Sequence, residues 1–220
     1  ERDDGYMDIS SGPDFYFTEY ETWPDSSKEA LKHARGRILD VGCGAGRHCL
    51  YFQSLGHEIV GIDNSPLAVE VCRRRGVKEA RVLSASQVTK KLGLFDTIIM
   101  CGNNLALLES QDRAPQMLKR FHPITNKDAI IIGQIRDPYL TDNPVHLNYH
   151  AYNLSRGRMP GQVRIRVRHQ LFKSPWFDYL FLSREELKEL LIGTGWRVRQ
   201  FVDQYIEEEG GMYWAVLEKD

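Results

Sequence analysis

Three glycines and two acids early in the chain have the spacing of a nucleotide-binding turn. The glycines Gly42, Gly44 and Gly46 directly follow an apolar run. Asp40 stands just before this turn, and Asp63 ends the next apolar run. A strand, a glycine-rich turn and a helix N-terminus in this order are typical of a nucleotide cofactor held across the carboxyl ends of two parallel strands.

The acid at Asp40 bears on which nucleotide the turn accepts. Dinucleotide sites place a pyrophosphate at the helix N-terminus, and their third glycine would fall where this chain has Arg47. A carboxylate close to that pyrophosphate would cost about 4 kcal/mol in a partly dry site. S-adenosylmethionine carries a sulfonium and an ammonium group and no phosphate, so the same acid favours it. The alternative that Asp40 and the glycine spacing disfavour is an NAD-dependent oxidoreductase.

Ordered motifs along the chain resemble those of the class I S-adenosylmethionine-dependent methyltransferases. They are DVGCGAG at 40–46, GIDNS at 61–65, FDTIIM at 95–100, LKELL at 187–191 and GW at 195–196. The resemblance covers about residues 36–135 and 183–219. It implies the α/β fold of that family, a doubly wound, mostly parallel seven-stranded sheet. It also implies methyl transfer from S-adenosylmethionine to a small-molecule acceptor, with S-adenosylhomocysteine as the product.

The resemblance and the residue chemistry together predict a set of cofactor-binding residues. The glycines let the backbone approach the methionine part of the cofactor, and Asp63 is expected to bind the ribose hydroxyls. Asp40 is expected to bind the cofactor ammonium, directly or through water, or only to cap the turn. Ser65 either flanks the adenine or serves as the N-cap of the next helix. The full predicted set is Asp40, Gly42, Cys43, Gly44, Gly46, Asp63, Asn64, Ser65, Ala85, Ser86, Cys101, Gly102 and Asn103.

Two later turns contribute to this set. After the third strand, relatives often carry an acid for the adenine amino group, whereas this chain has Ser84, Ala85 and Ser86, whose backbone can still read the adenine edge. The turn at 101–104 passes under the transferring methyl in the family, although its asparagines can also only satisfy their own backbone. It lacks the Pro-Pro motif of amide and adenine N-methyltransferases and the Pro-Cys nucleophile of RNA cytosine enzymes.

A general base is needed only if the methyl acceptor must lose a proton. His150, His146 and Tyr149 are weak candidates for that role, and each also has a structural interpretation. No catalytic residue is therefore assigned. A second alternative, from a different class, is a non-catalytic cofactor-binding or regulatory protein that kept the pocket without turnover.

Composition limits the partners of the chain. The 220 residues carry a formal net charge of −1, so no global field would draw the protein to nucleic acid or to an acidic membrane. No apolar run is long enough to cross a bilayer, and the oligomeric state stays open. The cysteine and histidine spacings match no zinc pattern, so we predict no metal site and expect reduced thiols of a cytoplasmic protein. The four cysteines are Cys43, Cys49, Cys72 and Cys101.

Alternating apolar runs and helical patterns predict the elements that position these residues. A capping box at Ser183 and Glu186 begins a late helix. Strands are expected at 37–41, 58–62, 80–83, 97–101 and 129–135, with an antiparallel terminal pair at 196–202 and 212–217 joined through 207–211. Helices are expected at about 47–55, 66–75 and 112–121.

The chain is expected to form one methyltransferase domain, 36–220, behind an N-terminal cap of residues 1–35. The cap is rich in aromatic residues and ends in a short helix from about Pro24 to Arg35. Residues 136–182 do not fit the alternation and are too many for a structureless loop. We therefore predict a β-rich insertion after strand five, and the resemblance to the methyltransferases implies that it covers the substrate.

Within this insertion, alternating residues at 163–168 predict a strand that pairs with 176–182 across a turn at 173–175. The arginines of the insertion, Arg164 and Arg166 among them, have two interpretations. They form either a solvated strand face or a site for an anionic small-molecule acceptor.

Overall fold

A seven-stranded sheet forms the centre of the computed structural model, which describes residues 1–9, 12–206 and 210–220. The strand order is β10-β11-β5-β4-β1-β2-β3. β1, β2, β3, β4 and β5 run parallel, whereas β11 is antiparallel to both β5 and β10. The strands are β1 (Ile38–Val41), β2 (Ile59–Asp63), β3 (Ala80–Val82), β4 (Phe95–Met100), β5 (Thr125–Arg136), β10 (Trp196–Ile206) and β11 (Gly210–Lys219). The predicted fold, doubly wound and mostly parallel, is confirmed.

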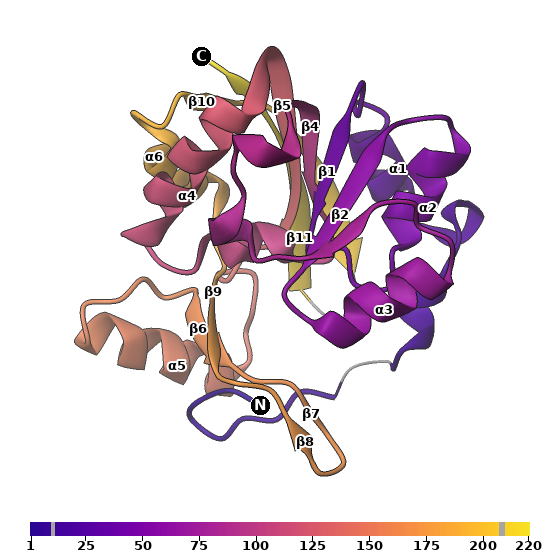
Figure 1. The fold of residues 1–220 in the computed structure, drawn as a ribbon. Helices are drawn as coiled ribbons and strands as arrows, with labels where there is room; N and C mark the ends of the chain where they lie inside the picture. The colour runs from indigo at the N-terminus through magenta and orange to yellow at the C-terminus, as the bar shows by residue number, and fades with distance from the viewer. Residues whose placement is uncertain (10–11, 207–209) are drawn as a thin grey trace.

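Helices cover both faces of the sheet (Figure 1). On one face lie α1 (Asp25–Leu31), α2 (Arg47–Ser54) and α3 (Pro66–Arg74), and on the other lie α4 (Arg113–Phe121) and α6 (Arg184–Leu191). Short 3₁₀ helices connect these elements: η1 (Asp14–Phe17), η2 (Tyr20–Thr22), η3 (Ala85–Gln87), η4 (Lys90–Leu92), η5 (Asn104–Leu108) and η6 (His122–Ile124). α1 ends at Leu31, four residues before the predicted end.

Local chemistry explains where two of the helices begin. The Ser65 hydroxyl accepts a hydrogen bond from Ala68 N at 3.2 Å, and Pro66 fits the first helical turn of α3. The predicted capping box at α6 is present, because Ser183 Oγ accepts from Glu186 N and the Glu186 carboxylate accepts from Ser183 N. These caps satisfy backbone donors that helices otherwise leave unpaired.

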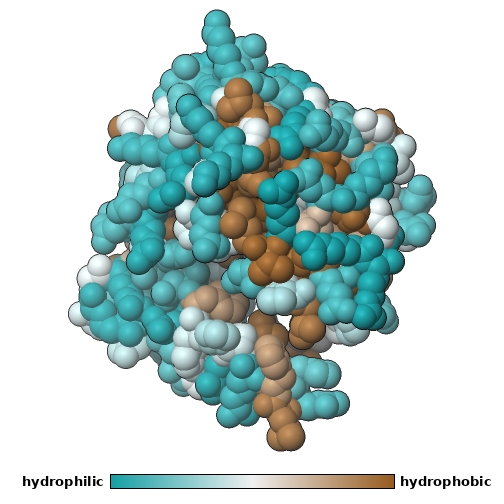
Figure 2. Space-filling view, viewed as in Figure 1, coloured by the Kyte–Doolittle hydropathy of each residue, from teal (hydrophilic) through white to brown (hydrophobic). Residues whose placement is uncertain are grey.

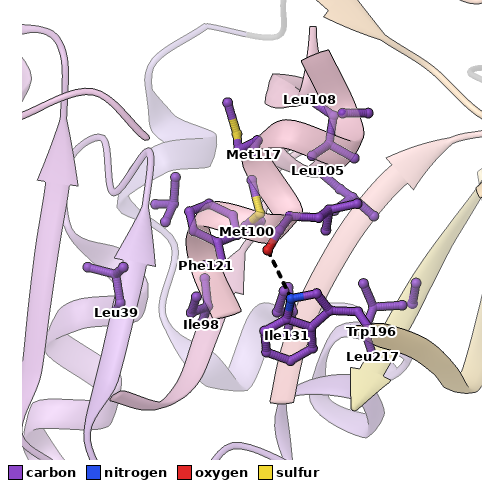
Figure 3. Close-up of a cluster of buried hydrophobic side chains, with 14 of the residues drawn as sticks. Leu39, Ile98, Met100, Leu105, Leu108, Met117, Phe121, Ile131, Trp196 and Leu217 are labelled. Atoms are coloured by element: carbon purple, nitrogen blue, oxygen red, sulfur yellow. Dashed lines mark hydrogen bonds between the residues drawn. The ribbon is translucent and has the colours of Figure 1, made fainter. Parts of the chain in front are cut away.

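Two hydrophobic clusters lie on the two faces of the sheet. In β1, Ile38 packs into the cluster under α1, α2 and α3, and Leu39 packs into the cluster under α4 and α6. Figure 3 shows part of the second cluster, in which Trp196 donates its indole N–H to the Leu118 carbonyl at 3.0 Å. The central strands are thus buried on both faces, as is typical of parallel sheets. The described residues contain no helix long and apolar enough to cross a membrane.

The segment after β5 forms a separate layer below the sheet in Figure 1. The predicted strand pairing is present there as the antiparallel pair of β6 (Gln162–Ile165) and β9 (Phe177–Leu180). The chain reverses at Gln170 and Leu171, between β7 (Arg168–His169) and β8 (Phe172–Lys173), so the turn predicted at 173–175 was wrong. Gln170 has a φ of 52°, which suits a tight reversal. The tip carries exposed Leu171 and Phe172, the apolar surface at the bottom of Figure 2.

The insertion also contains a helix, α5 (Pro144–Ser155), that we did not predict. Asn143 caps it by accepting a hydrogen bond from Val145 N at 3.0 Å. Only Tyr149 and Asn153 are buried on it, so its sequence lacks the apolar stripe that identifies most surface helices. The N-terminal residues lie against this layer, because Arg2 forms a β-bridge with Ile165. The predicted connection at 207–211 lies partly outside the described residues.

Candidate cofactor site

The carboxyl ends of β1, β2 and β4 meet at one edge of the sheet because these strands are parallel. The glycine turn after β1 is fixed to β2 by Gly42 N and Cys43 N, which donate to the Ile62 carbonyl at 2.8 and 3.0 Å. Gly44 has a φ of 53°, and a Cβ placed on it would meet nothing within 4 Å. Its backbone therefore faces open space, as a close approach by a ligand requires.

Asp63 connects the two strand ends. Its Oδ2 accepts a hydrogen bond from Gly44 N at 3.0 Å, and its Oδ1 accepts from Ser65 N at 2.9 Å. The side chain is only partly buried, and each carboxylate oxygen can accept a further hydrogen bond. Asp63 thus offers free acceptor capacity at the edge, beside the glycine turn.

Asp40 lies beneath the turn, where it is only 1% exposed. Its Oδ2 accepts a hydrogen bond from the Cys49 thiol at 3.3 Å, and its Oδ1 has no partner among the described residues. Burial raises the pKa of Asp40 to about 7. A buried oxygen without a partner is costly, so a donor or cation at this position would stabilise the carboxylate.

The loop after β4 is held by amide side chains. Asn104 Nδ2 donates to the carbonyls of Val41 and Gly42 at 3.1 and 2.9 Å, which fixes the loop to the glycine turn. Gly102 N donates to Gln134 Oε1 at 2.7 Å. Asn103 has a φ of 66°, and its buried Oδ1 has no partner among the described residues. Cys101 is buried just before this loop.

A buried network supports Gln134 from behind. Its Nε2 donates to Gln204 Oε1 at 2.7 Å, and the same oxygen accepts from the Trp214 indole at 2.9 Å. We missed Gln134 in the sequence, and predicted Asn104 only as a member of the turn at 101–104. The available signal for Gln134 was a polar residue within the apolar run of β5.

The remaining predicted residues lie on the β2 and β3 side of the edge. Leu83 N donates to the Asp63 carbonyl at 2.9 Å, which keeps the end of β3 beside β2. Ala85 and Ser86 follow in η3. Asn64 is exposed, and Ser65 is the N-cap of α3, the second of its two predicted roles.

The aromatic N-terminal segment is attached at the start of α2. Arg47 Nη1 donates to the Phe15 carbonyl and to Thr18 Oγ1, both at 3.0 Å. Tyr20 stacks on Tyr51 with a ring distance of 4.3 Å, so it packs on α2 and does not close over the turn. Arg47, at the position of the missing third glycine, therefore holds the cap in place.

Tyr179 brings the insertion to the same edge. Burial, followed by the Tyr16 and Asp63 side chains, raises the pKa of Tyr179 to about 12. It projects from β9, which packs against η5. We missed Tyr179 in the sequence, where its signal was the alternation of Phe177, Tyr179 and Phe181.

Two candidate bases on α5 serve to hold the N-terminal residues. The Tyr149 hydroxyl donates to Asp3 Oδ1 at 2.6 Å and accepts from Arg164 N at 3.3 Å. His146 Nδ1 lies 3.1 Å from Arg2 Nη1, which can only donate, so this ring nitrogen accepts.

The third candidate, His150, has a different environment. Its ring lies 6.2 Å from that of Tyr139, and burial lowers its pKa. It is therefore neutral near pH 7, as a proton acceptor must be.

Comparisons with known proteins agree with this geometry. A family model described as a methyltransferase domain matches residues 38–128. An uncharacterized methyltransferase of Schizosaccharomyces pombe is 30% identical over 99 residues, which cover 43% of this chain and 67% of that protein. A SAM-dependent methyltransferase of Bacteroides fragilis, solved with S-adenosylhomocysteine, superimposes with a TM-score of 0.74 and 26% identity over 94% of this chain and 81% of its own.

The chain belongs to the class I S-adenosylmethionine-dependent methyltransferases. Its cofactor is that of the family, S-adenosylmethionine, as the sequence predicted. A 1,6-didemethyltoxoflavin-N1-methyltransferase of Burkholderia thailandensis, solved with 1,6-didemethyltoxoflavin and S-adenosylhomocysteine, shares the fold with a TM-score of 0.61 and 20% identity over 94% of this chain and 81% of its own. The chain spans about half the length of the first curated relatives it matches.

The residues of the edge fit S-adenosylmethionine. Gly44 presents open backbone, Asp63 retains acceptor capacity for hydroxyls, and Asp40 Oδ1 is a buried acceptor without a partner. Gly44 therefore suits the amino acid part of the cofactor, Asp63 suits its ribose, and Asp40 suits its ammonium group.

Proposed function

We propose that the protein transfers a methyl group from S-adenosylmethionine to a small-molecule acceptor. The observation that carries this proposal is Asp63, whose carboxylate is hydrogen-bonded to Gly44 N at the open edge of the sheet. When bound, the cofactor supplies an electrophilic methyl on a good leaving group. The protein then has to bind, orient and exclude water, and such positioning can contribute roughly 7–11 kcal/mol to the rate.

Each part of the predicted set has a task in this proposal. Asp63 binds the ribose hydroxyls, and Asp40 holds the ammonium, directly or through water. The backbone of Gly42, Cys43, Gly44 and Gly46 accommodates the methionine part. Asn64, Ser65 and the backbone of Ala85 and Ser86 border the adenine, and Cys101, Gly102 and Asn103 border the methyl.

The insertion is the substrate cover in this proposal. Tyr179 supports this role because it belongs to β9, which packs against η5 directly after the loop at the end of β4. The acceptor would lie between this tyrosine and the loop after β4. If the acceptor must lose a proton, His150 is the remaining candidate base, because Tyr149 and His146 are already engaged.

We propose further that the methyl acceptor carries a negative charge, and one arginine of the insertion supports this. Arg164 lies 3.6 Å from Asp178, and Arg166 and Arg168 pair with Glu1. Arg158 differs, since its Nη1 is buried without a hydrogen-bond partner. We therefore assign an acidic group of the acceptor to Arg158.

All four cysteines are free thiols, which supports a cytoplasmic location.

A thermal-shift comparison tests cofactor choice first. S-adenosylmethionine and S-adenosylhomocysteine should raise the unfolding temperature, and NAD should not. Stabilisation by NAD alone would contradict the proposal.

A screen for transfer of a labelled methyl group to pools of small metabolites then tests turnover. Labelled product supports the enzyme. Tight binding of the cofactor without any labelled acceptor would favour the non-catalytic, regulatory alternative.

A further inference from the structure

Three buried thiols lie together beneath the glycine turn. The Sγ atoms of Cys43, Cys49 and Cys72 are all within 4.8 Å of one another, and each residue is at most 5% exposed. They come from three elements, namely the turn, α2 and α3. Their spacing along the chain matches no zinc motif, so only the fold brings them together.

Two glycines make room for these thiols. A Cβ on Gly46 would lie 2.5 Å from Cys72 Sγ. A Cβ on Gly61 would lie 2.9 Å from Cys49 Sγ and 3.0 Å from Cys43 Sγ. The three sulfur atoms therefore fit in this space because Gly46 and Gly61 have no side chain.

A carboxylate oxygen borders the same group. Asp40 Oδ2 lies 3.3 Å from Cys49 Sγ, and the residue is almost wholly buried. The three sulfurs are a donor set for a thiophilic divalent ion that prefers tetrahedral geometry, and the carboxylate lies beside one of them. Zn–S bonds of about 2.3 Å place the sulfurs of such a site roughly 3.8 Å apart, which lies within the 4.8 Å limit observed here.

Positive groups nearby offset the charge that such a site would carry. Arg73 and Arg75 act electrostatically on Cys72, and Arg47 acts on Asp40. Arg75 Nη1 also donates to the Ala45 carbonyl at 2.7 Å, so it stays beside the glycine turn. This arrangement lowers the cost of three thiolates in a buried position.

We propose that Cys43, Cys49 and Cys72 bind one thiophilic divalent metal ion of the zinc class, with a fourth position open to water. Each thiol gives up its proton to solvent when the ion binds. The ion would join the cofactor turn to α2 and α3, and would leave Asp40 Oδ1 free for the cofactor. A disulfide is the lesser alternative, because it would use two sulfurs and leave the third and the carboxylate without a partner.

Titration of the reduced, chelator-treated full chain with Cd²⁺ tests this site. We expect one ion per chain, a sulfur-to-metal absorption band, release of thiol protons and a higher unfolding temperature. Cys72→Ser should bind Cd²⁺ at least about a hundredfold more weakly. Cys101→Ser, which removes the buried thiol outside the cluster, is the matched control and should keep the affinity for Cd²⁺.

A measurement on the unaltered chain keeps the test valid if Cys72→Ser fails to fold. In mild denaturant, bound Cd²⁺ should protect Cys43, Cys49 and Cys72 from alkylation and leave Cys101 reactive. Equal protection of all four thiols, or unchanged affinity in Cys72→Ser, would overturn the proposal. Formation of a disulfide from two of these thiols in air, without any binding of Cd²⁺, would also overturn the proposal. None of these readouts uses the cofactor or an acceptor, so they are independent of the proposed methyl transfer.

Discussion

The cofactor edge and the insertion that borders it are held together by different kinds of contact. At the edge, backbone groups and short side chains bind one another, as in the hydrogen bonds of Asp63 to Gly44 N and of Asn104 to Gly42 O. In the insertion, charged and phenolic side chains bind the first residues of the chain. Arg166 pairs with Glu1 across 165 positions, and Tyr149 bonds Asp3 across 146.

This difference separates a fixed part of the molecule from an adaptable one. The edge has its conformation set by positive-φ glycines and strand pairing, which leave few alternatives. The insertion depends on partly exposed side-chain pairs, which contribute little each and are easily replaced. We therefore expect cofactor binding to depend on the edge, and acceptor choice to depend on the insertion.

The largest expected effect is on the stability of the edge. Gly46→Ala would place a Cβ 2.5 Å from Cys72 Sγ at a φ of 79°. Left-handed strain and overpacking together should lower the free energy of unfolding by about 3 kcal/mol. Gly56→Ala is the matched control, since Gly56 has a φ of 85° and open space, and should cost about 1 kcal/mol. If urea unfolding gave the same loss of free energy for both variants, the glycine turn would not be tightly packed.

The next effect concerns the affinity of the edge for its cofactor. Asp63→Ala removes the acceptor of Gly44 N and the proposed ribose ligand, so S-adenosylhomocysteine should bind at least about tenfold more weakly. Glu70→Ala, on the following helix, removes an exposed acid that pairs with Arg74 and should leave the affinity unchanged. Calorimetric titration measures both. Intact binding by Asp63→Ala would show that the ribose assignment is wrong.

The sequence predicted the edge because its signals are local. The order of strand, glycines, helix and acid determines which backbone groups face each other, and parallel pairing then aligns the strand ends. The box at Ser183 was predicted as a cap, and a cap was one of the two predicted roles of Ser65, because each acts within one helical turn. The ligand roles of the edge residues stay predictions until the cofactor is bound.

The insertion was predicted only where its pattern alternates. β6 and β9 follow a period of two, whereas α5 buries Tyr149 and Asn153 and shows no apolar stripe. Contacts between the first residues and the insertion leave no local trace in the sequence. The three-cysteine cluster escaped prediction for the same reason, because its members meet only through the packing of α2 and α3 on the turn.

A smaller effect tests whether Tyr149 is structural or catalytic. Tyr149→Phe removes the hydroxyl that bonds Asp3 and Arg164 N, and should lower the free energy of unfolding by about 1 kcal/mol. Tyr152→Phe, at a half-exposed neighbour on α5, should cost much less. Once an acceptor is known, kcat should be similar for both variants. A large loss of kcat in Tyr149→Phe alone would make this residue a base after all.

The smallest effect is a pH dependence of the contact between the insertion and the N-terminal residues. Burial and the nearby charges of Arg2 and Arg136 lower the pKa of His146, against a weaker opposing effect of Asp8 and Asp4. The folded state therefore prefers the neutral His146 ring. The neutral ring contributes to stability above about pH 6.5, the pKa of histidine in the unfolded chain, and this contribution is lost as the pH falls below that value.

Protonated His146 could no longer accept from Arg2 Nη1, and the two cations would repel each other. Asp3 N donates to the Arg164 carbonyl. Its hydrogen exchange, corrected for intrinsic rates, should become faster as the pH falls from about 7.5 to about 5.5. His146→Asn keeps an acceptor without a titrating ring, so its exchange should not respond to pH in this range. Parallel profiles for the two proteins would place the pH sensitivity elsewhere.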